Sequence, residues 1–313
     1  MLKFTSLLIL LFISTCVISQ EAQKKEEPIK YYGKEYFLIE GTTIPENQKE
    51  SPYDRLPASY KEKVRQPVWE LSKNSAGISV RFLSNSSSVK VKWTLLNDSK
   101  MNHMAETGIK GVDLYCKVKG SWIYVNTGRP TAKENEASLV STLSAIMREY
   151  KLYLPLYDGV TKLEIGIDSL STMQKPASGK YPPIVFYGTS ITQGGCASRT
   201  GMAYSNIISR KLNVDCVNFG FSGNGRMEAP IVEVMAEMNA LFYVIDCIPN
   251  MSLEEVQQNV APLVETIRAK HPNTPIVFLE NIEYTGSRFR EDISNDISSK
   301  NKALRSEYDK LLK

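Results

Sequence analysis

The chain has 313 residues, of which 42% are hydrophobic and 23% charged, so it is long enough for two domains with buried cores. Its net charge of +4 comes from 38 basic and 34 acidic residues, and these are interspersed along the chain. No long basic block is present, which argues against a nucleic-acid-binding protein.

Residues 1–19 have the pattern of an export signal. Lys3 supplies the positive start, "LLILLFISTCVIS" is a short apolar core, and Val17 and Ser19 are small enough to precede a cut before Gln20. This run is too short to span a bilayer, and no other stretch approaches the ~20 apolar residues that a span needs. The alternative is a lipoprotein signal with Cys16 as the lipidated residue. We favour soluble export, to the periplasm or the medium, because Thr15 fits the lipoprotein pattern poorly.

Four cysteines follow the signal: Cys116, Cys196, Cys216 and Cys247. In an exported chain they can form disulfides. Cys216 and Cys247, however, lie in apolar runs that resemble strands, where a cysteine usually acts as a small buried hydrophobe. For Cys196, in a glycine-rich loop, the pattern favours neither state.

Residues 30–170 predict an all-β domain. Apolar and polar residues alternate on both sides of "SNSSS", of Lys119-Gly120 and of Asp158-Gly159, which predicts three hairpins. Several short strands without a long helical pattern indicate a β-sandwich or jelly roll. The polar, aperiodic segment "SLSTMQKPASGKYPP" then predicts a linker.

Residues 182–313 have a different texture. Four short apolar runs, "IVFYG", "VDCVNFG", "LFYVIDC" and "PIVFLEN", alternate with helical patterns, which indicates strands buried on both faces. The clearest helix begins at Ser252, where Glu255 completes a capping box. This order predicts a flavodoxin-like, doubly wound parallel sheet of at least four strands with helices on both faces.

Three of these strand ends carry residues suited to acyl transfer. Ser190 follows the first strand, Gly223 lies in "NFGFSGNG" after the second, and Asn250 ends "DCIPN" after the third. Acyl transfer needs a nucleophile and hydrogen-bond donors directed at the developing oxyanion. A hydroxyl, an unobstructed backbone N–H and a side-chain amide meet that need.

Each of the three residues also has a structural interpretation. Ser190 can be a helix N-cap, Gly223 can permit a positive φ in a turn, and Asn250 can be part of an ordinary loop. Taken singly, the two interpretations are about equally good, because short motifs often match by chance. The order of all three strand ends along one chain favours chemistry.

The stretches "YGTSITQGG", "NFGFSGNG" and "DCIPNM" resemble the first three sequence blocks of the SGNH (GDSL-like) hydrolases. Upstream, "RLPASYKEKVRQPVWELSKNSAGISVRFLSNS" and "NHMAETGIKGVDLYCKVKGSWIYVNTGRP" resemble the GxDLY-type β domain of one bacterial branch. The resemblance implies that Ser190 is the nucleophile and that its own N–H, Gly223 and Asn250 are the oxyanion donors. Thr189 replaces the usual Asp, and Ile248 stands where the third block usually has Gly.

The family's fourth block, Asp-x-x-His, has no counterpart in the sequence. His103 falls in the β domain, and His271 follows a long helix on the side away from the three strand ends, so neither is expected to be the base. The final helical pattern also ends without a further strand. We therefore expect the hydrolase domain to be C-terminally incomplete, with the Asp and His of the family beyond residue 313.

The sequence thus predicts an exported serine esterase that deacetylates carbohydrate esters. Arg199 and Arg226 are candidate substrate-binding residues at the rim. No metal or organic cofactor is implied, because no His, Cys or carboxylate spacing fits a zinc site. The alternatives are an acylhydrolase of lipids or thioesters, and a non-catalytic glycan-binding protein that uses Trp69, Trp93 and Trp122. The oligomeric state is left open.

Overall fold

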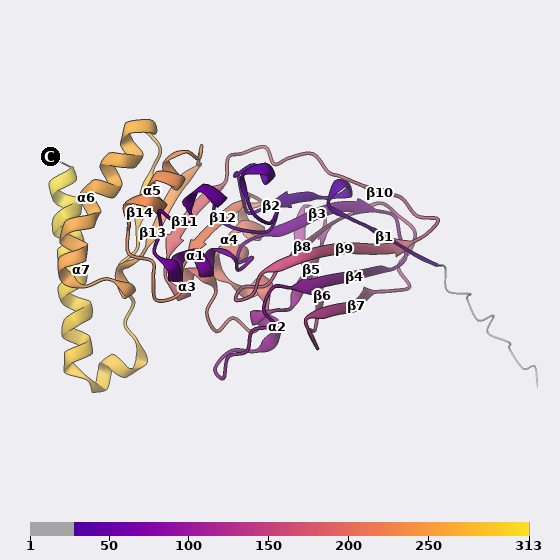
Figure 1. Ribbon diagram of the computed structural model, residues 1–313, viewed down its shortest axis with the longest axis horizontal. Helices are drawn as coiled ribbons and strands as arrows, with labels where there is room; N and C mark the ends of the chain where they lie inside the picture. The colour runs from indigo at the N-terminus through magenta and orange to yellow at the C-terminus, as the bar shows by residue number, and fades with distance from the viewer. Residues whose placement is uncertain (1–27, 313) are drawn as a thin grey trace, which may run out of the picture.

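The computed structural model describes residues 28–312, so the predicted export signal and Cys16 lie outside the described residues. Two antiparallel sheets fill one end of the molecule, and a parallel sheet with its helices fills the other (Figure 1). No helix in residues 28–312 combines the length and the apolar composition needed to cross a membrane.

The two antiparallel sheets are formed by residues 29–174. The first sheet has four strands, in the order β1 (Ile29–Tyr32), β9 (Val160–Asp168), β4 (Val89–Leu95) and β7 (Glu134–Val140). The second has the order β10 (Met173–Gln174), β3 (Ser79–Ser84), β8 (Arg148–Tyr153), β5 (Val112–Val118) and β6 (Ser121–Gly128), with β2 (Leu38–Glu40) also paired to β3. Three one-turn helices and two short α-helices connect them: η1 (Lys34–Tyr36), η2 (Glu46–Gln48), η3 (Ala58–Tyr60), α1 (Gln66–Ser72) and α2 (Glu106–Ile109).

The core of this domain follows from the alternation read in the sequence. Along β4 every second residue is buried, and Val91 and Trp93 enter a common apolar cluster with Phe82 of β3 and Leu152 of β8. The cluster therefore contains residues of both sheets, as a sandwich requires. The predicted all-β sandwich is confirmed.

Two of the three predicted hairpins are wrong. Only the Lys119-Gly120 turn joins paired strands, with Val118 opposite Ser121. The "SNSSS" segment joins β3 to β4, and Asp158-Gly159 joins β8 to β9, but in both cases the two strands belong to different sheets. These turns are corners between the layers of the sandwich. Alternation locates a strand but does not state its partner.

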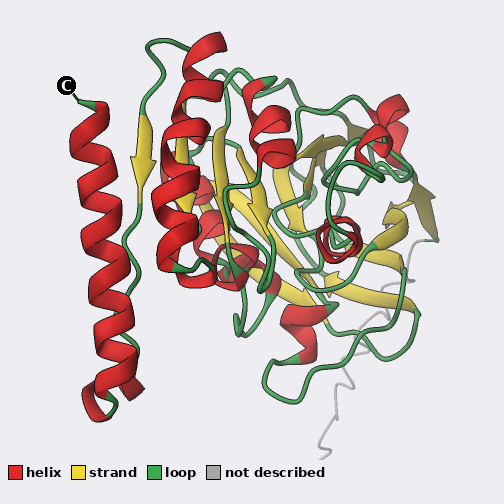
Figure 2. Cartoon of the chain, turned by 60° about the vertical axis from the view of Figure 1, so that its left-hand side comes forward, coloured by secondary structure: helices red, strands yellow, loops and turns green. Residues whose placement is uncertain are grey.

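The parallel sheet has the strand order β12 (Cys216–Gly220), β11 (Ile184–Gly188), β13 (Phe242–Asp246) and β14 (Ile276–Phe278). Its helices are α3 (Ser190–Gln193), η4 (Thr200–Met202), α4 (Tyr204–Leu212), α5 (Ala229–Ala236), η5 (Ile248–Asn250), α6 (Leu253–Lys270), η6 (Thr285–Phe289) and α7 (Glu291–Leu311). Figure 2 shows α7 lying beside α6 at the end of the molecule.

Helices cover both faces of the parallel sheet, as the continuous apolar runs predict. Val185 and Tyr187 of β11 pack with residues of α5 and α6, whereas Ile184 and Phe186 pack against α4 on the other face. The predicted capping box is also present, because the Ser252 and Glu255 side chains each accept the other's backbone N–H, at 3.1 and 2.7 Å.

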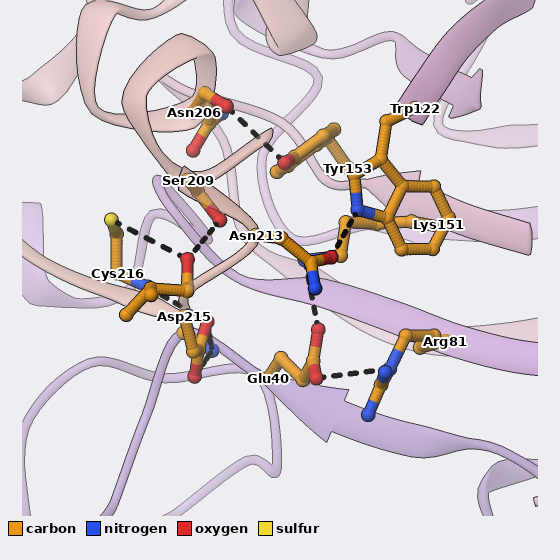
Figure 3. Close-up of polar contacts among 12 residues, drawn as sticks. Glu40, Arg81, Trp122, Lys151, Tyr153, Asn206, Ser209, Asn213, Asp215 and Cys216 are labelled. Carbon is orange, nitrogen blue, oxygen red and sulfur yellow. Dashed lines mark hydrogen bonds and ion pairs between the residues drawn. The ribbon is translucent and has the colours of Figure 1, made fainter. Parts of the chain in front are cut away.

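The β domain packs on the parallel sheet near the sheet's amino edge, the edge where its strands begin. There the Lys151 Nζ lies 2.9 Å from Glu40 Oε2, and Asp215, just before β12, accepts the N–H of Gly41 at 2.9 Å (Figure 3). The Trp122 indole donates to Asn213 Oδ1 at 3.1 Å. Asp215 and Asn213 therefore bond groups of the β domain at this edge, beside the Lys151–Glu40 pair, which lies within the β domain.

Candidate active site at the carboxyl edge of the parallel sheet

The three strand ends singled out in the sequence meet at one edge of the sheet. β11 lies between β12 and β13, and Gly188 pairs with both Gly220 and Asp246 in parallel register. The residues that follow these strands therefore emerge side by side at the carboxyl edge, where parallel sheets commonly bind ligands.

Ser190 begins the short helix α3 but does not cap it. The residue before it, Thr189, has extended backbone angles and accepts the Ile191 N–H through its side chain at 3.2 Å, so Thr189 is the N-cap. Within residues 28–312, no group forms a hydrogen bond with the Ser190 hydroxyl, and the residue is only partly buried. The cap interpretation of Ser190 is wrong, and its hydroxyl stays available for chemistry.

Gly223 lies in a tight turn over residues 221–225. The Phe221 carbonyl accepts the N–H groups of Asn224 at 2.8 Å and Gly225 at 3.0 Å, which closes the turn. Gly223 has φ +70°, and the space beside its Cα is open. Its conformation is therefore the left-handed one that favours glycine, and no side chain fills the space beside the turn at this position.

Asn250 ends η5 and faces the 221–225 turn. Its hydrogen-bond network directs the carboxamide oxygen toward the N–H groups of Asn224 at 3.0 Å, Gly223 at 3.2 Å and Gly225 at 3.3 Å. The amide nitrogen then points to the opposite side, toward acceptors. The structure thus brings Gly223 and Asn250 into direct contact, and the turn orients the Asn250 amide.

Gln193 and Tyr157 also belong to this edge, although nothing in the sequence analysis identified them. The buried Gln193 accepts the Ser222 N–H at 2.9 Å and donates to Leu156 O at 3.0 Å. Tyr157, from the loop between β8 and β9, donates to Ser190 O at 3.3 Å, and burial raises the pKa of its phenol. The β domain therefore supports the loop that carries Ser190.

Asp246 lies beneath the Ser190 loop. Its carboxylate accepts the Thr192 hydroxyl at 2.9 Å and the Tyr204 hydroxyl at 3.1 Å, and burial raises its pKa. Both hydroxyls are thus committed to one carboxylate oxygen, which fixes α3 to the end of β13. This arrangement gives Asp246 a supporting role for the Ser190 loop.

Neither histidine lies at the carboxyl edge. The His271 Nε2 is 2.9 Å from Ala236 O, and its ring packs against Tyr243, at the side where β13 and β14 begin. His103 is exposed, with Nδ1 2.9 Å from Asn102 Oδ1 in the β domain. Neither forms a contact with Ser190, Gly223 or Asn250 in the described residues, as the sequence predicted.

The two arginines predicted at the rim have protein partners. Arg199 Nη1 lies 3.6 Å from the buried Asp113 carboxylate, and its guanidinium stacks on the Tyr124 ring at 4.2 Å. Arg226 lies 3.5 Å from Glu255 Oε1 and donates to Gly223 O at 3.5 Å. Arg226 therefore contacts the 221–225 turn itself, while the substrate-binding role of both residues stays a prediction.

The three tryptophans do not form a binding surface. Trp69, Trp93 and Trp122 are at most 9% exposed. The Trp93 and Trp122 indoles donate to Lys110 O and Asn213 Oδ1, so their polar ends are also satisfied. Sugar stacking requires an open ring face, and the glycan-binding alternative therefore loses the residues on which it depended.

The four described cysteines are all free thiols. Cys116, Cys216 and Cys247 are buried, as the apolar context of the last two predicted, and Cys196 is exposed in the loop after α3. Residues 28–312 contain no group of three or more His, Cys, Asp or Glu side chains that can hold a metal ion.

The comparisons with known proteins agree with this architecture. The model of the GDSL-like Lipase/Acylhydrolase family matches residues 181–313, and that described as the N-terminus of Esterase_SGNH_hydro-type matches residues 29–173. The structure of a GDSL-like lipase from Bacteroides ovatus ATCC 8483 is 32% identical over 91% of this chain and 83% of that chain, with a TM-score of 0.86. The chain belongs to the GDSL-like lipase/acylhydrolase family. It is an SGNH-type ester hydrolase.

Two more distant structures share the fold. The salicylyl-acyltransferase SsfX3 from a tetracycline biosynthetic pathway is 15% identical, with a TM-score of 0.72, over 89% of this chain and 80% of that chain. A family two carbohydrate esterase from Cellvibrio japonicus is 11% identical, with a TM-score of 0.54, over 89% and 86%. Among curated proteins, none matches this sequence.

Proposed function

We propose that this hydrolase is an exported esterase that removes short acyl groups, chiefly acetyl, from carbohydrate esters, with Ser190 as its nucleophile. The observation that carries the proposal is the convergence of three strand ends on one edge of the sheet. There the Ser190 hydroxyl forms no hydrogen bond with any residue between 28 and 312, and the Gly223 N–H and Asn250 carboxamide lie 3.2 Å apart.

In the proposed reaction the Ser190 Oγ attacks the ester carbonyl carbon and loses its proton to a general base. The carbonyl oxygen becomes an oxyanion, which accepts hydrogen bonds from the backbone N–H groups of Ser190 and Gly223 and from the Asn250 amide nitrogen. The intermediate expels the sugar alcohol, which takes a proton, and leaves Ser190 acylated. Water then releases the acid by the same steps in reverse.

The 221–225 turn is suited to this task because Asn250 accepts three of its N–H groups. When the Gly223 N–H turns to a substrate oxygen, those of Asn224 and Gly225 still hold the carboxamide in place, at 3.0 and 3.3 Å. The Asn250 amide is therefore held in place before substrate arrives, whereas the Gly223 N–H must turn from Asn250 to the substrate oxygen.

The proposed general base is neither His103 nor His271. His103 is exposed in the β domain, and the His271 ring contacts Ala236 O at the amino edge. The family resemblance implies a histidine that is oriented by an aspartate. We propose that such a histidine accepts the Ser190 hydroxyl proton. Replacement of His103 or His271 by Gln is expected to leave the rate of ester hydrolysis unchanged.

The carbohydrate substrate is supported by two observations of unequal strength. The export pattern in residues 1–19 supports a location among extracellular polymers. The carbohydrate esterase from Cellvibrio japonicus has the same fold, which is a weaker argument because one fold serves many substrates.

The experiment compares kcat/KM on acetylated polysaccharide, acetylated monosaccharides and long-chain p-nitrophenyl esters, with Ser190→Ala as the control. Release of acetate from a glycan, dependent on Ser190, is the expected result. A preference for long-chain esters without acetate release from any glycan would leave a lipid esterase instead. Transfer of the acyl group to another alcohol, with no free acid formed, would indicate an acyltransferase.

A further inference from the structure

A buried arginine of the β domain reaches the end of β12. Arg55 is only 2% exposed, and its guanidinium donates to four backbone carbonyls. Two acceptors belong to its own domain, Asn74 O at 2.8 Å and Leu71 O at 2.5 Å. The other two belong to β12, Asn218 O at 3.0 Å and Gly220 O at 2.7 Å. The side chain therefore joins the β domain to the strand that precedes the 221–225 turn.

Arg55 also contacts the first residue of that turn. Its guanidinium carbon lies 4.9 Å from the centre of the Phe221 ring. Phe221 is fully buried, and its carbonyl closes the turn by accepting the N–H groups of Asn224 and Gly225. The position of the Gly223 N–H is thus set by a strand end and a ring that both rest on Arg55.

The charge of Arg55 has no counter-ion. Within residues 28–312, no carboxylate oxygen lies within 4.0 Å of the guanidinium, and the neighbouring Asp54 instead pairs with Lys73 at 2.8 Å. Burial lowers the pKa of Arg55 to about 9, so it stays protonated at neutral pH. An unpaired buried charge is costly, and a purely structural arginine at a domain interface is expected to have an anionic partner.

The field of this charge reaches the Ser190 loop. Burial raises the pKa of Tyr157, and the Arg55 guanidinium opposes that rise, since a nearby cation favours the phenolate. The same Tyr157 hydroxyl donates to Ser190 O at 3.3 Å. The cation therefore acts on groups at both the Ser190 loop and the 221–225 turn, in an interior where charges are poorly screened.

We propose that Arg55 is a positioning residue of the active site: it holds the 221–225 turn, and its uncompensated positive charge stabilises the oxyanion that forms there. The missing counter-ion is supplied during the reaction, by the negative charge on the substrate oxygen. This inference rests on the proposed roles of Ser190 and Gly223.

The variants Arg55→Gln and Arg55→Lys separate charge from packing. Gln keeps a hydrogen-bond donor but removes the charge, whereas Lys keeps the charge but loses the planar set of guanidinium N–H donors. Arg268→Gln is the matched control, because Arg268 also donates to two backbone carbonyls, His271 O at 3.2 Å and Thr274 O at 2.5 Å, at the amino edge. Thermal unfolding of each variant reports how much of its effect is lost stability.

Hydrolysis of a small acetyl ester is the first measurement. For Arg55→Gln we expect kcat to fall about 10-fold or more with KM changed less than about 3-fold, because the interaction exists only in the transition state. Arg55→Lys should recover part of kcat even if it is no more stable than Arg55→Gln. A kcat that follows the melting temperature alone, with Lys no better than Gln, would overturn the role of the charge.

Hydrogen exchange at residues 221–225 is the second measurement, and it does not depend on activity. We expect faster exchange there in Arg55→Gln and wild-type exchange in Arg268→Gln. Wild-type exchange in both would overturn the positioning role. If Ser190→Ala hydrolyses the ester as fast as the wild type, the proposed function fails instead, and exchange alone then decides whether Arg55 holds the turn.

Discussion

The two edges of the parallel sheet are built from different kinds of residue. At the amino edge, Lys151 pairs with Glu40 within the β domain, and Asp215 of the α/β domain accepts the backbone N–H of Gly41. At the carboxyl edge the three candidate site residues are uncharged, and Ser190 keeps a hydroxyl to which no described residue bonds. The β domain contacts both edges, but a hydroxyl without a partner among the described residues is a feature of the carboxyl edge's candidate site.

The difference shows how one fold separates stability from chemistry. Buried charges at the amino edge are satisfied by protein partners, so removing one of them destabilises the fold. At the carboxyl edge the donors are positioned by neighbours but leave room for a substrate oxygen. Mutations at the two edges are therefore expected to affect different quantities, which the following predictions exploit.

Ser190→Ala should give the largest effect. Without the nucleophile, kcat/KM for a small acetyl ester should fall by at least about 10³-fold, while the melting temperature changes little. Steady-state kinetics with Ser198→Ala, an exposed serine after the same helix, provide the control, and that variant should behave as wild type. If the Ser190→Ala variant hydrolysed the ester as fast as the wild type, the active site would have to lie elsewhere.

Asn250→Ala should lower kcat by about 10²–10³-fold, the usual cost of one oxyanion donor. KM should change much less, since the hydrogen bond forms in the transition state. Asn259→Ala is a suitable comparison, because Asn259 donates to Arg226 O from α6 at 3.0 Å. If the Asn250→Ala variant kept the full kcat, Asn250 would not be an oxyanion donor.

Lys151→Met tests the amino edge. Glu40 would keep Arg81 at 3.0 Å but lose its second cation, so we expect a loss of about 2 kcal/mol in the free energy of unfolding, below the ~3–5 of a fully orphaned charge. Urea denaturation measures this loss, and kcat of the folded enzyme should be unchanged. Lys162→Met breaks an exposed pair of the same 2.9 Å length and should cost less than about 1 kcal/mol.

The smallest expected effect is a difference in alkylation between two thiols, one near each edge of the sheet. Cys196 is exposed near the carboxyl edge, whereas burial raises the pKa of Cys216, which begins β12 at the amino edge. Brief iodoacetamide treatment of the native protein at pH 8 should therefore alkylate Cys196 well before Cys216. Peptide mass spectrometry distinguishes them, and equal modification would mean that the amino edge is open.

Sequence patterns predicted the parallel sheet and the edge at which its three candidate strand ends meet. Runs such as "IVFYG" are buried on both faces and end in small residues, and consecutive parallel strands end at one edge, so Ser190, Gly223 and Asn250 could be placed together. The β domain was predicted less completely. Strand positions follow from alternation, but the corners after β3 and β8 depend on which sheet the next strand joins, which local sequence does not specify.

The supporting residues could not be predicted for a related reason. Tyr157 and Arg55 act across the domain contact, and nothing near either residue in the sequence indicates which strand end it will meet. Tyr157 precedes the predicted Asp158-Gly159 turn, and its neighbours in the sequence do not mark it as a residue of the site. Arg199 and Arg226 were placed at the rim from their neighbours in sequence, but Asp113 and Glu255 lie within 3.6 and 3.5 Å of them.

The most direct test of the account is to find which residue a fluorophosphonate probe modifies in the native protein. The probe reacts only with an activated serine beside oxyanion donors. Tryptic mapping should locate the label on Ser190 alone, and the Ser190→Ala variant should stay unlabelled. Label on a different serine, or equal labelling of the variant, would contradict the assignment of this edge as the catalytic centre.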